Sequence, residues 1–458
     1  MNKLSVGFSR MDITPMRGIG LAGYYNERRA SKIRDNLNVS ALAIESGEKR
    51  VLLISLDLLQ IQTPICNAYR RAISEGTGIP FESIFLHCTH THTAPYVDPN
   101  RPLEQGIVAD PEHLQMIRDY QQFVKLRLVN VCQQAIEDLK PAKMGYAVGD
   151  APNISFIRRY RMKDGSVRTN PGRNNPDVVA PMGEVDTRVN LVRFDREGGK
   201  SVALVNFGNH PDVIGGSGVS ADWPGFLCKS LEQALDDVFC IFFNGAQGDV
   251  NHVCIDATRG WHGDMLVDFS NNSGYAHAKY MGRFLAGSVL QIWDKVCYTD
   301  VEEICVTERL MKLPSNMPTP EQMPEAHRIN DLHMAGRDDE LPYKDMMLVT
   351  VVAEAGRMVA LEHGPEFFEM PLIGLSIGNV ALVGIPGEPF NGIGLGIKEA
   401  KGWDMIMPCC LVNGCEGYFP MKDAYDEGGY EARSSNYKAG TAEQIIEEGK
   451  AILASLRN

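Results

Sequence analysis

Short runs of apolar residues, rich in branched and aromatic side chains, recur along this chain, and each run stops in a polar loop that contains glycine. Five of them cover residues 83–88, 202–207, 240–244, 379–385 and 405–412. Runs of this length and composition predict buried β-strands. In α/β sheets, ligands bind in the crevice beyond the carboxyl ends of the strands. Polar residues that follow these runs can therefore meet in space although they lie far apart in the sequence.

Longer segments with a helical recurrence of apolar positions lie between the runs. Residues 111–139 predict a long amphipathic helix with Pro111 in its first turn, and residues 220–235 join a turn to another helix. Residues 273–296 and 441–456 predict two more. The pattern predicts an α/β fold of mixed β-sheets flanked by helices, organised as one large domain over residues 1–458.

Two regions break this pattern. Residues 150–190 are rich in Pro, Gly and Asn and predict a long loop, of the kind that is often functional in compact enzymes. Residues 297–370 change character and predict an accessory subdomain within the large domain. Inside it, residues 301–313 and 346–362 alternate like strands around a charged segment.

Composition favours a globular enzyme and narrows its partners. The chain has 458 residues, of which 44% are hydrophobic and 22% are charged, and its net charge is −13. This charge argues against nucleic acid as a partner. No uncharged stretch is long and apolar enough for a transmembrane helix, and no signal peptide is visible at the N-terminus. Eleven cysteines without a C-x-x-C pair suggest a reducing compartment. We therefore expect a cytoplasmic protein, and the oligomeric state stays open.

Three of the polar loops carry residues suited to metal binding. His90 follows the first run, His210 the second and Glu388 the fourth. Zinc prefers imidazole nitrogen and carboxylate oxygen, and a catalytic site keeps one position open. His90 and His92 stand two apart, so in extended chain they point to the same side and both can be ligands on spacing alone. The pattern predicts a metal-dependent hydrolase.

At this point the motifs resemble a known family. The order VGFSRMDITP, RVLLISLDLL, THTHTAP, a strand that ends in His210, then NGAQGDVN and GIPGEPF is similar to the catalytic domain of neutral ceramidases. These enzymes are zinc amidases that cleave the N-acyl bond of ceramide. The resemblance runs from about residue 5 to about residue 435. It implies that His90, His210 and Glu388 bind zinc and that His92 contacts the substrate.

The resemblance also implies roles for residues late in the chain. A tyrosine completes the zinc shell of the family and a second tyrosine, twelve residues later, faces the substrate; Tyr418 and Tyr430 have this separation. An arginine of the family binds near the scissile group, which Arg158 matches, with the adjacent Arg159 as the alternative. Asp222, in an S-x-D-x-x-G pattern, is implied to lie near the metal. From the residues alone, Asp222 can equally cap the helix that follows it.

One departure from the family changes the chemistry. The GDVSPN motif of the family reads GDVNHV here, so Asn251 stands where the family has its active-site serine. An amide can donate a hydrogen bond to an oxyanion but cannot be acylated. A route through metal-activated water remains, for which Asp249 is the predicted general base. We expect Asn251 to stabilise or orient the substrate, and His252 either assists or lies in a surface loop.

Three functions follow from the sequence. The first is zinc-dependent hydrolysis of an N-acyl bond in a ceramide-like or other acylated amine. The second keeps the metal and changes the substrate to a soluble ester, lactone or carbohydrate derivative. The third is a metal-binding or ligand-binding protein without catalysis. Pocket shape separates the first two, since a long apolar channel favours acyl chains, whereas a short pocket lined with Arg and Asn favours a polar substrate.

Overall fold

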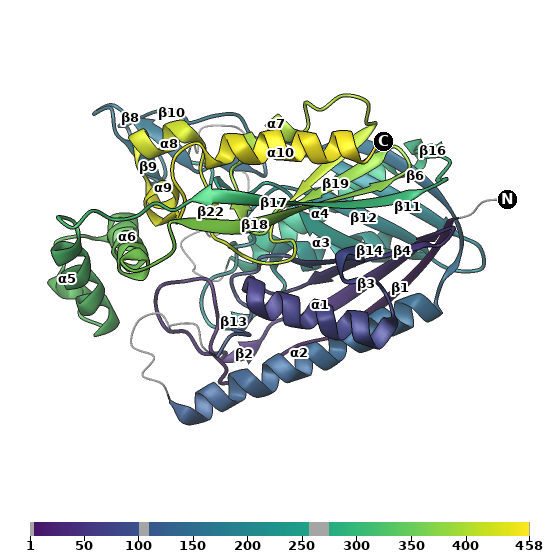
Figure 1. Cartoon of the computed structure of the whole chain (residues 1–458), viewed down its shortest axis with the longest axis horizontal. Coiled ribbons are helices and arrows are strands. Elements are labelled where there is room, and N and C mark those ends of the chain that lie inside the picture. The colour runs from purple at the N-terminus through teal and green to yellow at the C-terminus, as the bar shows by residue number, and fades with distance from the viewer. Residues whose placement is uncertain (1–3, 100–109, 256–273, 458) are drawn as a thin grey trace.

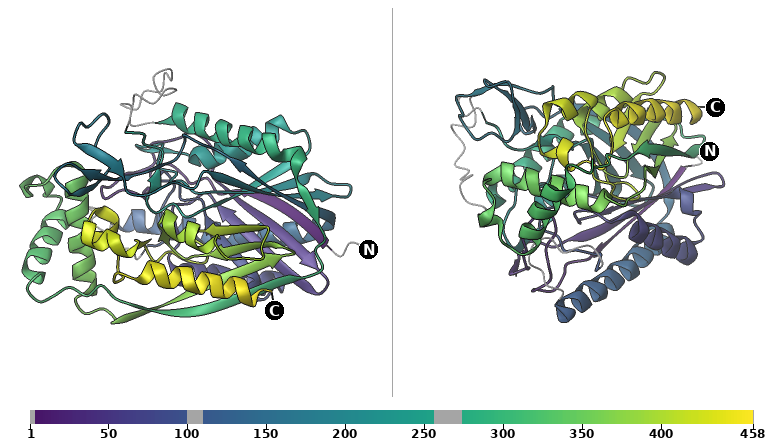
Figure 2. Two further views of the ribbon diagram at one scale, coloured as in Figure 1. Left: turned by 90° about the horizontal axis from the view of Figure 1, so that it is seen from above. Right: turned by 60° about the vertical axis from the view of Figure 1, so that its left-hand side comes forward.

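Two β-sheets, stacked face to face and covered by helices on both outer sides, form the body of the molecule. The computed structural model describes residues 4–99, 110–255 and 274–457. The helices α1 and α2 cover the outer face of the larger sheet beside β1 and β3, and α10 covers the outer face of the smaller sheet (Figure 1). Seen from above, α4 and α10 lie on opposite outer surfaces (Figure 2). The layers therefore run helix, sheet, sheet, helix.

The larger sheet has nine strands and mixes parallel with antiparallel pairs. Its order is β14 (Val238–Asn244), β12 (Ser201–Phe207), β11 (Arg188–Arg196), β6 (Lys140–Asp150), β1 (Leu4–Asp12), β3 (Asn38–Ser46), β4 (Lys49–Leu56) and β5 (Ile84–Cys88), with β16 (Cys297–Thr299) paired to β6. The smaller sheet has four strands, β17 (Ile304–Pro314), β18 (Phe367–Ile377), β19 (Val380–Gly384) and β21 (Met405–Cys409). The pairs β4–β5, β12–β14 and β19–β21 are parallel.

The strands do not alternate between polar and apolar residues because both faces of the larger sheet are covered. In β3, Val39, Ala41 and Ala43 pack toward α1 and α2. Leu42 and Ile44, one residue out of step, pack into the core between the two sheets. Because both faces of the sheet are covered, successive residues are apolar. The five predicted strand runs are confirmed as β5, β12, β14, β19 and β21, and the predicted α/β fold of mixed sheets and helices is confirmed with them.

The ten α-helices of the described residues differ in length and in the layer they cover. They are α1 (Thr63–Thr77), α2 (Pro111–Glu137), α3 (Asp222–Ala234), α4 (Tyr275–Ile292), α5 (Met323–Met334), α6 (Asp345–Leu361), α7 (Asn391–Ile397), α8 (Lys422–Glu427), α9 (Tyr430–Ser434) and α10 (Thr441–Ser455). The long helix predicted from Pro111 is α2, and the side chain of Asp110 accepts a hydrogen bond from the Glu112 amide at its start. The other predicted helices are α3, α4 and α10.

Two local predictions were wrong. Residues 346–362 form the helix α6 and not a strand, since their apolar positions pack against α5 and α9. Residues 150–190 contain the small strands β7 (Phe156–Ile157), β8 (Arg159–Met162), β9 (Val167–Thr169) and β10 (Val178–Pro181), so the region is not a plain loop. Within residues 297–370, β17 pairs along its whole length with β18 of the smaller sheet, whereas α5 and α6 pack on each other at one end of the molecule (Figure 1).

Short two-stranded pairs fix the loops beyond the large sheets. The strand β15 (Val250–Asn251) pairs with β7, and β20 (Glu388–Pro389) pairs in parallel with β22 (Tyr418–Phe419). A third pair joins β2 (Lys32–Ile33) to β13 (Gly218–Val219). These pairs tie together loops that follow different strands, and so they decide where the polar residues of those loops lie.

Candidate metal centre

Three imidazoles from two distant loops meet beyond the carboxyl ends of β5 and β12. One ring nitrogen from each of His90, His92 and His210 lies within 4.8 Å of the others. The ring centroid of His90 is 4.9 Å from that of His92 and 4.9 Å from that of His210. His90 has a positive φ of 77°, a conformation that non-glycine residues rarely adopt and that clusters at functional sites. The predicted convergence of strand-end histidines is therefore present.

Backbone carbonyls hold all three rings in one orientation. The Nδ1 atoms of His90, His92 and His210 donate hydrogen bonds to the carbonyl oxygens of Leu59 (2.9 Å), Gly23 (2.9 Å) and Gln247 (2.8 Å) respectively. A carbonyl oxygen only accepts, so each Nδ1 carries the proton and each Nε2 keeps a free lone pair. A carbonyl oxygen on the outer ring nitrogen is the arrangement that orients histidines as metal ligands.

A carboxylate completes the donor set. Oε2 of Glu388 lies 3.2 Å from Nε2 of His90 and 3.2 Å from Nε2 of His210, and the Tyr418 hydroxyl lies 3.3 Å from the same His210 atom. The pairing of β20 with β22 sets Glu388 directly opposite Tyr418. Among the described residues, the buried Nε2 atoms of His90 and His92 have no hydrogen-bond partner. Lone pairs so close to a carboxylate repel it unless a cation lies between them, so these residues fit a zinc ion.

The protonation states agree with this interpretation. Burial, together with the neighbouring His90, holds the pKa of the His92 imidazole well below its usual value. Burial and the Arg158 guanidinium lower the pKa of His210. Neutral imidazoles and an ionised carboxylate are the forms that bind a divalent metal.

Glycine allows two of these loops to touch. A Cβ atom on Gly248 would lie 2.5 Å from the carbonyl oxygen of Glu388, and the Gly248 amide donates a hydrogen bond of 2.8 Å to the Pro389 carbonyl. The side chain of Gln247 in the same loop lies 3.4 Å from Oε2 of Glu388. The GAQGD segment therefore presses its backbone against the strand that presents Glu388.

A buried ion pair lies behind Tyr418. Nε of Arg158 donates a hydrogen bond of 2.6 Å to Oε1 of Glu431, and the side chains are 6% and 0% exposed. Nη2 of Arg158 donates to the Tyr418 hydroxyl at 3.1 Å. The ring of Tyr430 lies 5.6 Å from that of Tyr418, and its hydroxyl is 2.9 Å from that of Tyr25. Sequence reasoning missed Glu431 and Tyr25, although Glu431 directly follows Tyr430.

The other predicted residues lie around this centre in different ways. Oδ1 of Asp249 accepts the amide of Asn391 at 2.7 Å, and burial raises the pKa of Asp249 to about 6. The neighbouring Arg159 and Arg158 oppose this rise in the pKa of Asp249, and Glu431 adds to it. Arg159 binds Glu427 at 3.1 Å rather than the cluster. The general-base role of Asp249 stays a prediction, and its contacts favour a supporting one.

Asn251 and Asp222 are engaged by protein groups. The Asn251 amide donates to Asn170 at 3.1 Å and its oxygen accepts the Val253 amide at 3.0 Å. Asp222 is the first residue of α3, and its carboxylate accepts the amides of Ile214 and Trp223 at 2.8 Å and 2.6 Å. The two hydrogen bonds of Asp222 anchor the loop after His210 to the start of α3.

An acidic residue that sequence reasoning passed over lies beside the imidazoles. Asp212, two residues after His210, accepts a hydrogen bond of 3.2 Å from Nδ1 of His252. Burial would raise the pKa of Asp212, but the hydrogen bond from His252 holds it below its ordinary value. Its position in the NHPDV segment was the only signal in the sequence.

A cavity of about 420 Å³ adjoins the histidine cluster on this side. Its wall includes Tyr24, whose ring centroid is 5.5 Å from that of His92, and the guanidinium of Arg28 stacks 4.0 Å over the same tyrosine. The other polar side chains of the wall are Asn26, Asp212, His252 and His277. Polar and charged side chains therefore make up much of the wall of this cavity.

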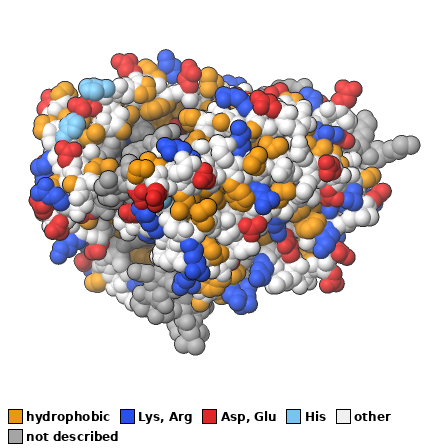
Figure 3. Space-filling view, turned by 90° about the horizontal axis from the view of Figure 1, so that it is seen from below, with side chains coloured by type: hydrophobic (Ala, Val, Ile, Leu, Met, Phe, Trp, Pro, Cys, Tyr) orange, Lys and Arg blue, Asp and Glu red, His pale blue; other side chains and the backbone are white. Residues whose placement is uncertain are grey.

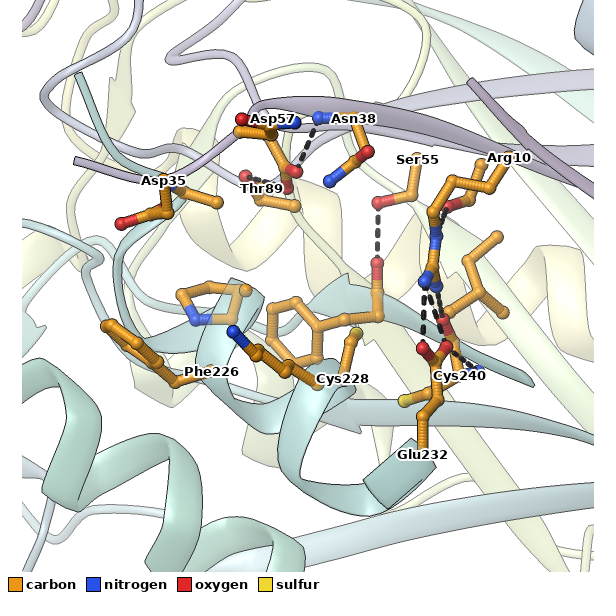
Figure 4. Close-up of a pocket in the computed structure, with 18 of the residues that line it drawn as sticks. Arg10, Asp35, Asn38, Ser55, Asp57, Thr89, Phe226, Cys228, Glu232 and Cys240 are labelled. Carbon is orange, nitrogen blue, oxygen red and sulfur yellow. Dashed lines mark hydrogen bonds and ion pairs between the residues drawn. The ribbon is translucent and has the colours of Figure 1, made fainter. Parts of the chain in front are cut away.

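A second cavity, of about 500 Å³, has Thr89 of the THTHT segment in its wall. Figure 4 shows it between Asp57, Asn38 and Thr89 at one side and Phe226, Cys228 and Glu232 at the other. Asp57 accepts the Asn38 amide at 2.8 Å, and Arg10 pairs with Glu232 at 2.9 Å. Thr89 borders this cavity, and the next residue, His90, belongs to the histidine cluster.

The surface and the helices add two observations. On the face shown in Figure 3, basic and acidic side chains are interspersed and no extended basic patch is seen. Of the helices in the described part of the chain, none is long and apolar enough to cross a membrane.

Comparison with known proteins identifies the fold. No protein-family model and no curated protein matches the sequence. Among solved structures, the chain is similar to the neutral ceramidase from Pseudomonas aeruginosa, with a TM-score of 0.73 and 17% identity over 100% of this chain and 75% of that one. A structure described as ceramidase complexed with C2 matches with a TM-score of 0.72 and 16% identity, over 100% of this chain and 76% of the other. The chain thus has a neutral ceramidase-like fold, as the sequence motifs predicted.

Proposed function

We propose that this chain is a zinc-dependent hydrolase that cleaves an acyl bond, with an N-acyl amide as the first candidate. The observation that carries the proposal is the set of three histidines whose Nδ1 atoms are held by carbonyl oxygens, beside the carboxylate of Glu388. The likeness in fold to ceramidases supports the amide as substrate. His90, His210, Glu388 and Tyr418 are the proposed ligands, and His92 the proposed substrate contact.

Each side chain has a task in this proposal. A bound zinc ion would polarise the substrate carbonyl and make water more acidic. The Nδ1–H of His92 is tied to Gly23, so its Nε2 faces the substrate as an acceptor. Arg158 keeps its positive charge because Tyr418, Glu431 and Asp212 face it, and it holds the Tyr418 hydroxyl in place. Tyr430 and Tyr25 form a pair of hydroxyls that can orient a polar group of the substrate.

A second candidate keeps the metal and takes a soluble, polar substrate, such as an ester, a lactone or a carbohydrate derivative. The cavity beside His92 favours it, because Asn26, Arg28, Asp212 and His252 line a space of about 420 Å³. Charged side chains pay a desolvation cost against a long alkyl chain but can pair with hydroxyl or amide groups. The two candidates differ in the group bound here and share the chemistry at the carbonyl.

Metal content and hydrolysis, measured on the same samples, test the proposal. Protein stripped with a chelator and reloaded should hold about one zinc ion per chain, and His90→Ala and His210→Ala should hold much less. The matched control is His327→Ala, which removes an exposed histidine of α5 that pairs with Glu362. Reloaded wild type is then assayed with a short-chain fluorogenic ceramide, p-nitroacetanilide, p-nitrophenyl acetate and N-acetylglucosamine.

The pattern of turnover decides between the candidates. Cleavage of the ceramide above all others supports the lipid amide, and cleavage of the acetylated sugar or of the small acetyl compounds supports the polar substrate. Zinc binding without turnover of any of the four would refute the hydrolase and leave a metal-binding protein. A wild type that binds no zinc would refute the metal centre itself.

A further inference from the structure

A carboxylate–imidazole pair stands in the wall of the cavity next to the histidine cluster. Nδ1 of His252 donates a hydrogen bond of 3.2 Å to Oδ1 of Asp212, and the side chains are 12% and 22% exposed. Both residues line the cavity of about 420 Å³, so a molecule bound there meets the pair. Neither residue belongs to the proposed ligand set.

Backbone hydrogen bonds fix the pair relative to the cluster. The His210 amide donates to the Val250 carbonyl at 3.1 Å, which joins the loop of Asp212 to the loop of His252. The His92 amide donates to the Pro211 carbonyl at 3.1 Å, immediately before Asp212. The pair therefore lies directly beside the rings that surround the reacting centre.

The other polar residues of the site are held by hydrogen bonds of their own. Asn251 cannot accept a proton from water, and both ends of its amide are engaged by Asn170 and Val253. Asp249 accepts the amide of Asn391 at 2.7 Å. His92 and His210 already have their Nδ1 atoms on carbonyl oxygens and their Nε2 atoms at the centre. His252 lines the cavity and has the carboxylate of Asp212 on its Nδ1 atom.

We propose that His252, positioned by Asp212, transfers the protons in the acyl-bond hydrolysis, an inference that rests on the proposed function. Because Nδ1–H of His252 donates its hydrogen bond to Asp212, the lone pair of Nε2 stays free. Nε2 takes a proton from the attacking water as the new oxygen–carbon bond forms and the carbonyl electron pair moves to its oxygen. The C–N or C–O bond then breaks, the carbonyl reforms, and the Nε2 proton passes to the leaving group. One water is consumed and His252 returns to its starting form.

The role of Asp212 in this scheme is that of a positioning residue. A carboxylate on Nδ1 fixes the tautomer and stabilises the imidazolium that forms, which is the division of labour in base–carboxylate pairs generally. Each member of this pair stands close in the sequence to another residue of the site. Asp212 follows His210 by two residues, and His252 directly follows the asparagine that replaces the serine of the family motif.

Kinetics on two acetyl substrates test the assignment. His252→Ala should lower kcat on p-nitroacetanilide by about 10²–10⁴-fold, the usual contribution of a general acid–base group. The loss on p-nitrophenyl acetate should be smaller, because p-nitrophenolate leaves without a proton. Added imidazole should restore part of the rate in His252→Ala, and zinc content should match wild type. His327→Ala, which removes a histidine from another carboxylate pair, should retain the wild-type rate and show no response to imidazole.

A second measurement needs no turnover. In ¹⁵N NMR spectra of histidine-labelled, metal-free protein, the ring of His252 should carry its proton on Nδ1, and Asp212→Asn should change that tautomer balance. A proton on Nε2 in the wild type overturns the proposal by itself. Wild-type kcat in His252→Ala, with activity lost in His90→Ala, overturns the pair and leaves the hydrolase intact. If reloaded wild type cleaves no substrate of the panel, the proposed function fails and this inference falls with it.

Discussion

Glu431→Gln tests how the buried arginine behind the candidate site is supported. The substitution keeps the size of the side chain and its ability to accept hydrogen bonds, and it removes one negative charge. Glu431 is fully buried, accepts Nε of Arg158 at 2.6 Å and also accepts the Thr169 hydroxyl at 3.0 Å. The variant leaves the buried guanidinium of Arg158 without its closest counter-charge.

The expected cost follows from this burial. Removing one partner of a buried ion pair destabilises a protein by about 3–5 kcal/mol, because the remaining charge stays desolvated and uncompensated. Asp212 also faces Arg158 and offsets a part of the loss. We therefore expect Glu431→Gln to lower the free energy of unfolding by about 3 kcal/mol. The Tyr418 hydroxyl, which Arg158 holds at 3.1 Å, should lose its fixed position as well.

Urea unfolding in the presence of a chelator measures this effect without a metal contribution. Far-ultraviolet circular dichroism and tryptophan fluorescence, followed together, check that one transition is being compared. The matched control is Glu325→Gln, which breaks a pair with Arg328 whose side chains are 57% and 46% exposed. An exposed pair of this kind is screened by solvent and contributes little to the free energy of unfolding.

A double-mutant cycle separates the pair from other effects. Arg158→Gln combined with Glu431→Gln leaves no unpaired charge, so the double variant should be more stable than the sum of the two single losses by about 2 kcal/mol or more. The reasoning is refuted if Glu431→Gln costs no more than Glu325→Gln, or if the two single losses simply add.

Three further predictions concern packing, pH and metal binding. Gly282→Ala should destabilise the protein by about 2–3 kcal/mol, because its Cβ would lie 2.6 Å from a backbone nitrogen of α3. Gly287→Ala in the same helix meets no atom within 4 Å and should stabilise the protein by about 0.5 kcal/mol. Thermal unfolding of the two variants tests this difference. Burial raises the pKa of Asp57 to about 7, so the native state binds an extra proton and stability falls as pH rises from about 4 to about 7. Asp57→Asn should remove about 1–2 kcal/mol of that fall, a modest value because water in the adjoining cavity screens the charge. Urea unfolding at pH 4.5 and 8 measures the change, and an unchanged pH profile would contradict it. His92→Ala should keep most of its zinc, by elemental analysis, while catalytic turnover is lost, and a loss of zinc equal to that in His90→Ala would make His92 a ligand instead.

Much of the fold can be predicted from the sequence because strong apolar runs have few alternatives. The runs that became β5, β12 and β19 are short, branched and bounded by polar loops, so a buried strand was the simplest interpretation. Residues 346–362 show the limit of this reasoning. Their apolar positions suit either period, and the neighbours α5 and α9 decided for a helix.

The proposed ligands also follow from local signals, whereas their supporting residues do not. His90, His210 and Glu388 each stand directly after a strand-like run, so their convergence could be expected from the general geometry of α/β sheets. Glu431 lies 273 residues from Arg158 in the sequence, and no spacing rule connects the two. Its importance arises from burial beside a cation, which is a property of the folded state.

The sequence by itself determined the periodicity of the elements and the residue types at the strand ends. Only the tertiary structure decided that His252 meets Asp212, that Asp249 faces the start of α7, and that carbonyl oxygens take the Nδ1 protons of the three histidines. The physical reason is the range of the forces involved. Apolar periodicity is written into neighbouring residues, whereas hydrogen bonds and charges act across space between segments that only the packed sheets bring together.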